Sequence, residues 1–280
     1  MNNLVLNPIS DKKIAAYISS PSHALIIIGP TGSGIFKVAK SIAENIVGTN
    51  DIESYPYKHI VSTENNSIGI DVIREIDQFL SLKVPGNNEI KRFVIIENAH
   101  LMTIEAQNSL LKNLEEPPSD TVFILTVTHT KALLPTILSR AQAISVGVPS
   151  KEQLKSKHSD INNETFTKLF NMSGGKPDIL EALINDSEHP LNEAVEYARR
   201  ILSSNRYERM LLVNELQPNP ELINSILDTL VNMSQISLEA STLDSYKKWG
   251  DVLRASYVAK DALQKNAQPK LVLMNLMLSL

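Results

Sequence analysis

The sequence predicts an α/β domain, a parallel sheet flanked by helices, followed by a region that is helical to the end. Short β-branched runs alternate with segments of helical spacing up to residue 149. One of these runs leads through a glycine-rich turn directly into a helical segment. Beyond residue 150, apolar residues recur every three or four positions without another strand-like run. Because strand and helix alternate in the first part, the sheet should be parallel, with helices on both faces.

Three strands and three helices are expected in the first part. The strands are short, apolar runs, and the first two helices show apolar residues at helical spacing. The strands are His23–Ile28, Phe93–Glu97 and Thr121–Val127, and the first two helices are Ile35–Ile46 and Ile70–Leu80. A third helix has readable ends, because Thr103 can cap it, Glu105 suits its first turn and Pro117–Pro118 stop it.

The chain divides into three predicted domains. Residues 1–149 form the α/β domain, residues 150–186 a small helical lid, and residues 187–280 an all-α domain. The lid sequence is interrupted near its middle by Gly174–Gly175 and Pro177. The last domain should contain long amphipathic helices and a final apolar one, over Arg199–Leu216, Pro220–Met233, Leu243–Lys265 and Leu271–Leu280.

Composition excludes several classes of protein. The chain has 280 residues, a net charge of -4 and no cysteine. A disulfide framework and a thiolate zinc site are therefore excluded, and no global basic field attracts nucleic acid. The N-terminal sequence does not resemble a signal peptide, and the apolar runs are shorter than the roughly 20 residues that span a bilayer. We expect a soluble, cytoplasmic protein without a membrane partner.

The glycine-rich turn Gly29–Gly34 has the spacing of a phosphate-binding loop between a strand and a helix. Gly29, Gly32 and Gly34 are present, but Ile35 and Phe36 replace the lysine and the hydroxyl residue that contact phosphates and Mg²⁺. The turn is thus predicted to be a degenerate nucleotide loop. The alternative is a glycine-rich turn that never held a nucleotide.

A second site at the end of the next strand is also incomplete. An apolar strand that ends in two acids can hold Mg²⁺ with the first and activate water with the second. Here Glu97 keeps the first carboxylate, but the amide of Asn98 is not a useful base. The alternative, which this pair taken alone favours, is that Glu97 and Asn98 merely end the strand. Two losses at chemically essential positions predict that this chain does not hydrolyse ATP alone.

Two long blocks resemble the bacterial AAA+ clamp-loader family. Ile95–Pro118 is similar to the family's Walker B strand and the following helix, which ends L-L-K-x-L-E-E-P-P. Phe123–Thr128 and Leu134–Ala141 resemble the sensor-1 strand and the S-R-C motif. Asn266–Leu276 is similar to the last collar helix. The resemblance implies an AAA+ P-loop domain, a helical lid and a C-terminal collar that joins five subunits in a ring.

Retained and lost residues together resemble the delta-prime type within this family. That type has a degenerate P-loop but keeps the arginine of the S-R-C motif, here Ser139 and Arg140. The resemblance implies that Arg140 acts in trans as an arginine finger in a neighbouring subunit's ATP site. The implied partners are a clamp-loader ATPase subunit and a delta subunit, with the sliding clamp and primed DNA contacted through the complex.

Three departures from the family pattern are visible. Ala141 replaces the cysteine of S-R-C, which leaves the arginine in place. The family commonly carries a four-cysteine zinc module, and this chain has no cysteine. Pro177 stands where ATPase members have a sensor-2 arginine, with Lys176 beside it. No cofactor is therefore expected to be required: the lost sites argue against ATP with Mg²⁺ on this chain, and the missing cysteines against zinc.

The expected function is that of a non-hydrolysing clamp-loader subunit, not an enzyme by itself, acting in DNA replication. Two alternatives stay open. An autonomous P-loop NTPase with an unusual loop would bind and turn over Mg-ATP alone. A scaffold outside replication that kept the fold would show no affinity for a DNA polymerase III ATPase subunit.

Overall fold

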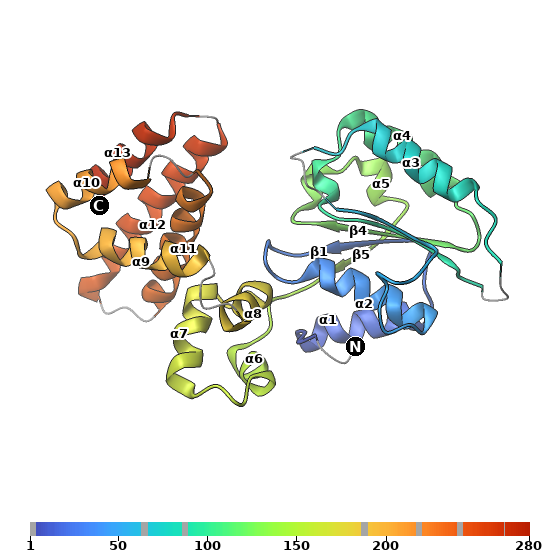
Figure 1. Cartoon of the computed structure of the whole chain (residues 1–280), viewed down its shortest axis with the longest axis horizontal. Helices are drawn as coiled ribbons and strands as arrows, with labels where there is room; N and C mark the ends of the chain where they lie inside the picture. The colour runs from blue at the N-terminus through green and yellow to red at the C-terminus, as the bar shows by residue number, and fades with distance from the viewer. Residues whose placement is uncertain are drawn as a thin grey trace. The chain divides into compact units, whose positions relative to one another are not determined.

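The computed structural model describes residues 4–62, 67–85, 89–185, 190–216, 220–239, 243–265 and 267–280. Its backbone divides into two compact units, residues 1–153 and 154–280, which are described separately (Figure 1). The division into three domains stays a prediction, and its boundary between residues 186 and 187 lies outside the described residues.

The first unit is built on a five-stranded sheet in the order β2-β3-β4-β1-β5, with every neighbouring pair parallel. In β1, Ala24 is opposite Phe123 of β4, and Leu25 is opposite Gln142 of β5. The strands are β1 (Ala24–Ile28), β2 (Lys58–Val61), β3 (Arg92–Ile96), β4 (Thr121–Val127) and β5 (Gln142–Ser145).

Helices cover both faces of this sheet, as the sequence predicts (Figure 1). Leu25 and Ile27 of β1 pack into the core on the side of α1 and α2, whereas Ala24 and Ile26 pack on the side of α3, α4 and α5. This alternation follows from the two-residue period of a strand. The helices are α1 (Pro8–Ser19), α2 (Ile35–Val47), α3 (Ile70–Ser81), α4 (Ile104–Glu115) and α5 (Pro135–Leu138), with short 3₁₀ turns η1 (Ala99–Leu101) and η2 (Thr130–Ala132).

The predicted ends of α4 are confirmed. The Thr103 hydroxyl accepts a hydrogen bond of 3.2 Å from the Ala106 N–H, which satisfies one of the unpaired donors at the helix start. Glu105 lies in the first turn. The helix ends at Glu115, before the two prolines.

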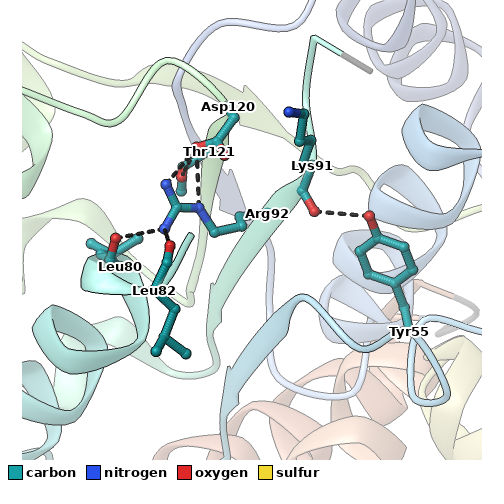
Figure 2. Close-up of polar contacts among 7 residues, drawn as sticks. All are labelled: Tyr55, Leu80, Leu82, Lys91, Arg92, Asp120 and Thr121. Carbon is teal, nitrogen blue, oxygen red and sulfur yellow. Dashed lines mark hydrogen bonds and ion pairs between the residues drawn. The ribbon is translucent and has the colours of Figure 1, made fainter. Parts of the chain in front are cut away.

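A buried arginine joins three segments of the first unit (Figure 2). Arg92, at the start of β3, forms an ion pair of 2.6 Å with Asp120, which immediately precedes β4. Its Nη1 donates to the carbonyl oxygens of Leu80 and Leu82, at 2.5 and 3.1 Å. These carbonyls lie at the C-terminus of α3, where a cation is favoured by the helix dipole. Arg92 therefore fixes the end of α3 against the entrance of the two central strands.

From residue 151 onward, the regular elements among the described residues are all helices. Within the second unit, α7 packs on α8 and α11, and α11 also packs on α9 and α12. Helix α13 packs on α10 and α12. The bounds are α6 (Lys151–Lys157), α7 (Asn163–Ser173), α8 (Pro177–Asn185), α9 (Pro190–Ser203), α10 (Arg206–Leu216), α11 (Pro220–Glu239), α12 (Leu243–Gln264) and α13 (Pro269–Ser279).

The single helix expected over Arg199–Leu216 is wrong, because α9 ends at Ser203 and α10 begins at Arg206. The Asn205 side chain accepts hydrogen bonds from the N–H groups of Tyr207 and Glu208, at 3.0 and 3.1 Å. Asparagine competes in this way with helical hydrogen bonds and starts a new helix. The apolar spacing continues across the break, which is why periodicity does not reveal it.

The predicted break at Gly174–Gly175 is confirmed as the C-terminus of α7. Both glycines have positive φ, 60° and 72°, a conformation that side chains with a Cβ disfavour. A Cβ on Gly174 would lie 2.8 Å from Cγ of Asn232 in α11. Glycine at this position therefore allows α7 to end directly against α11.

Candidate functional site

The loop from Gly29 to Gly34 links β1 to α2 and is closed by its own hydrogen bonds. Gly32 and Gly34 have φ of 79° and 80°, so both need glycine. The N–H and the hydroxyl of Ser33 both donate to the Pro30 carbonyl oxygen, at 3.0 and 2.6 Å. The predicted strand–loop–helix architecture is thus present.

Hydrocarbon fills the space beside this loop. Ile35 is 8% exposed and packs in the core between α2 and the sheet. A Cβ on Gly29 would lie 2.6 Å from Cγ2 of Ile35, so the isoleucine side chain lies directly against the first glycine. Phe36 packs against the same core, and the Lys40 ammonium lies 4.4 Å from its ring centroid. Both side chains pack in the core. Neither supplies a positive charge to a phosphate or an oxygen ligand to Mg²⁺.

Glu97 and Asn98 follow β3. The Glu97 N–H donates to the Val61 carbonyl oxygen at 2.9 Å, which extends the pairing with β2. Asn98 has φ 51° and ψ 46°, the left-handed conformation that asparagine tolerates better than most residues. Its N–H donates to the hydroxyl of Thr126 in β4 at 3.1 Å. Asn98 thus begins a turn that is fixed to the neighbouring strand.

The loop and the Glu97–Asn98 pair lie at the same edge of the sheet. β1 and β3 are the two neighbours of β4, and all three strands run in parallel. The Gly29 N–H donates to the Val127 carbonyl oxygen, at the end of β4, at 3.1 Å. Two strand spacings, about 10 Å, therefore separate the loop from the acidic position. This is the edge at which open parallel sheets bind ligands.

Arg140 lies between the end of α5 and the start of β5. Its Nη1 donates to the Thr136 carbonyl oxygen at 3.0 Å and to the Ser139 hydroxyl at 3.2 Å. Its Nη2 forms an ion pair of 2.7 Å with Glu115, the last residue of α4. The Arg140 side chain is 35% exposed, so part of the guanidinium faces solvent.

The strand register places Arg140 at the edge of the sheet opposite the Gly29–Gly34 loop. Gln142 pairs with Leu25 in parallel, so Arg140 precedes β5 at the amino end of the sheet. The loop begins at Gly29, beyond the carboxyl end of β1. Six residues of strand span about 20 Å, which exceeds the reach of an arginine side chain. Arg140 is therefore too distant to contact a phosphate in this chain's own loop.

Two partners of these residues were not predicted from the sequence. Thr126 is a buried polar residue in an otherwise apolar strand, which is a signal for a specific hydrogen bond. Glu115 and Glu116 are acids at a helix C-terminus, against the helix dipole, which indicates a nearby cation. Neither signal identifies the partner, because the first contact depends on the pairing of β3 with β4 and the second on the packing of α4 and α5.

His100 and His129 lie near the same edge of the sheet as the Gly29–Gly34 loop. Their ring centroids are 5.6 Å apart. Burial, and to a smaller extent the neighbouring His129, lower the pKa of His100 below its ordinary value. Among the described residues, no group of three His, Cys, Asp or Glu side chains could hold a metal ion. In the same ranges, no helix combines the length and apolar character needed to cross a bilayer.

Known proteins are similar to this chain in sequence and in fold. A family model described as "DNA polymerase III, delta subunit" matches residues 13–149. The DNA polymerase III subunit delta' of Haemophilus influenzae is 28% identical over 252 residues, covering 83% of this chain and 76% of that protein. The subunit delta' of Bacillus subtilis is 29% identical over 182 residues, covering 59% of this chain and 55% of the relative.

A solved structure of a DNA polymerase III gamma subunit-related protein from Thermotoga maritima superposes with a TM-score of 0.55. The alignment covers 96% of this chain and 97% of that protein at 21% identity, which supports the fold alone. The fold is thus an α/β AAA+ fold with a helical C-terminus. Together with the family match and the delta' relatives, this fold supports a similarity of the chain to the delta-prime clamp-loader subunits of DNA polymerase III.

Proposed function

We propose that this chain acts in DNA replication as a clamp-loader subunit that does not hydrolyse ATP itself. In this proposal Arg140 completes the ATP site of a neighbouring ATPase subunit. The other partners are a delta subunit in the same five-subunit ring, and the sliding clamp and primed DNA, which bind through the complex.

The position of Arg140 carries this proposal. Arg140 is partly exposed at the amino edge of the sheet, opposite the chain's own loop. An arginine in that position can reach a phosphate only in another molecule. A guanidinium placed against a γ-phosphate stabilises transition-state charge and is worth about 10³–10⁵ in rate in comparable enzymes. Ser139, whose hydroxyl accepts from Arg140, would orient the side chain.

The loss of local ATP chemistry supports the non-hydrolysing part. Ile35 fills the side of the loop with hydrocarbon, and Phe36 packs in the core. Asn98 provides an amide and a turn where hydrolysis needs a base. We propose that the chain requires neither ATP with Mg²⁺ nor zinc, so that a chelator leaves its unfolding midpoint unchanged.

The decisive experiment measures ATP hydrolysis by the purified chain, alone and mixed with its ATPase subunit, clamp and primed DNA. We expect no turnover by the chain alone and stimulated turnover in the mixture. Replacing Arg140 with alanine should reduce the stimulated rate at least about 10³-fold, while assembly of the complex is retained. The loss arises because alanine leaves transition-state charge uncompensated.

Lys131→Ala is a matched control, because it removes an exposed cation from the same unit. It should leave the stimulated rate unchanged. Robust turnover by the isolated chain would contradict the non-hydrolysing assignment and favour the autonomous NTPase. Wild-type stimulation in the Arg140→Ala complex would exclude the finger role.

A further inference from the structure

The Arg140 guanidinium is held by contacts within its own chain. Nη1 is bonded to the Thr136 carbonyl and the Ser139 hydroxyl, both beside the end of α5. Nη2 is paired with the Glu115 carboxylate at the end of α4. Three of the five N–H donors of a guanidinium are thus engaged inside this subunit. The side chain thus folds back over the end of α5 and remains partly exposed.

The charge of Glu115 is unfavourable at its position, the last residue of α4. The C-terminus of a helix carries partial negative charge, so a carboxylate there is unfavourable. Glu116, the next residue, adds a second negative charge at the same end of α4. Arg140 offsets this charge, and the pair joins the ends of α4 and α5, which pack together. Without the arginine, Lys112 in the last turn of α4 would be left to offset two carboxylates at one helix end.

A carboxylate and a phosphate compete for the same guanidinium. Both accept N–H donors from the planar fork in similar geometry. A nucleotide phosphate that approached Arg140 would also be repelled by Glu115 and Glu116 while the ion pair is closed. Full engagement of a phosphate therefore requires Glu115 to give up Nη2.

We propose that Glu115 holds Arg140 in an inactive position in the free subunit. The phosphates of the neighbour's nucleotide then displace this carboxylate when the ATP site closes. The inference rests on the finger role proposed above. The pair is well suited to release, because its side chains are 35% and 50% exposed and such pairs are weak. Glu115 is then a regulatory positioning residue that limits premature use of the finger.

The first test needs only the full-length chain. Phenylglyoxal modifies accessible guanidinium groups, and peptide mass spectrometry gives the rate at Arg140. Glu115→Gln keeps the size of the side chain and removes its charge, so we expect the modification of Arg140 to become about two- to five-fold faster. Glu116→Gln is the matched control, which should leave the rate unchanged. Equal rates of Arg140 modification in wild type and Glu115→Gln would show that Glu115 does not hold Arg140 in place.

The second test uses the complex with its ATPase subunit. Without DNA and at limiting ATP, Glu115→Gln should raise the hydrolysis rate about two- to five-fold, because the carboxylate no longer competes. A lower rate would mean that Glu115 aligns the finger, and an unchanged rate that it does not compete with nucleotide; either overturns the proposal. Should Arg140→Ala leave hydrolysis intact, the finger role fails, and the phenylglyoxal rates still decide whether Glu115 holds Arg140.

Discussion

The backbone N–H of Asn98 donates a hydrogen bond of 3.1 Å to the hydroxyl of Thr126, which is completely buried in β4. This bond fixes the residue after the Walker B-like strand to the neighbouring sensor-1-like strand. Among the residues that the structure describes, Asn98 is the one non-glycine residue with a positive φ. The residue at this point of the carboxyl edge is thus one suited to a left-handed turn.

Replacing Asn98 with alanine or with glycine should separate backbone strain from side-chain contacts. Both variants lose the same amide, but only alanine has a Cβ in the left-handed conformation. We expect Asn98→Ala to be less stable than Asn98→Gly by about 1 kcal/mol. Urea unfolding followed by far-UV circular dichroism measures the difference. Equal midpoints would show that the turn relaxes to a negative φ.

Arg92→Met should destabilise the first unit by about 2–3 kcal/mol, because Asp120 keeps a charge with its cation removed. Circular dichroism reports both units, whereas Trp249, the single tryptophan, lies in the second unit and packs against its core. The dichroism transition should shift to lower urea, and the fluorescence transition should shift less. Arg74→Met, which breaks the exposed pair with Asp71, is the control and should have little effect.

Acid should weaken the same contact. Burial tends to raise the pKa of Asp120, but hydrogen bonds and charge from Arg92, with the Thr121 hydroxyl, outweigh it and hold that pKa below its ordinary value. A lowered folded-state pKa stabilises the fold above the unfolded pKa of about 4, and this stability is lost as pH falls through the folded value. The urea midpoint should therefore fall more steeply below about pH 4 in wild type than in Asp120→Asn.

Gly174→Ala should destabilise the second unit through both backbone strain and a clash with Asn232. The left-handed conformation alone costs about 1–2 kcal/mol for a residue with a Cβ. In an Asn232→Ala background the carboxamide is gone, so the same substitution should cost about 1 kcal/mol less. Trp249 fluorescence in urea measures all four variants. Additive effects would show that α7 and α11 separate enough to admit the methyl group.

Arg140→Lys should give a stimulated ATPase rate between those of wild type and Arg140→Ala. Lysine keeps the positive charge but lacks the planar fork that can contact two phosphate oxygens at once. The measurement is steady-state hydrolysis by the reconstituted complex with clamp and primed DNA. A rate equal to wild type would mean that charge alone suffices at this position.

Strongly patterned elements could be predicted from the sequence, and weakly patterned ones could not. The strand Thr121–Val127 is fully buried, and its apolar run predicts both ends. In contrast, β2 and β5 are edge strands of four residues, in which one residue each is buried. Edge strands gain their pairing from the neighbouring strand rather than from their own hydrophobicity, so composition does not reveal them.

The candidate site follows the same rule. The loop and the Glu97–Asn98 pair are read from contiguous motifs, and the parallel strands bring both to one edge of the sheet. The contact of Arg140 with Glu115 joins residues 25 positions apart at the ends of two helices. It depends on the packing of α4 on α5, which no local pattern specifies.

The strand order has a consequence for how the first unit forms during synthesis. Among the described strands, β1 pairs with β4 and β5 alone, so Ala24 has no partner in the sheet until Phe123 has been synthesised. Contacts between residues so distant in sequence form slowly and leave apolar strands exposed meanwhile. While the ribosome is still making residues 29–120, the run Ala24–Ile28 is an unpaired, aggregation-prone segment that a chaperone could shield.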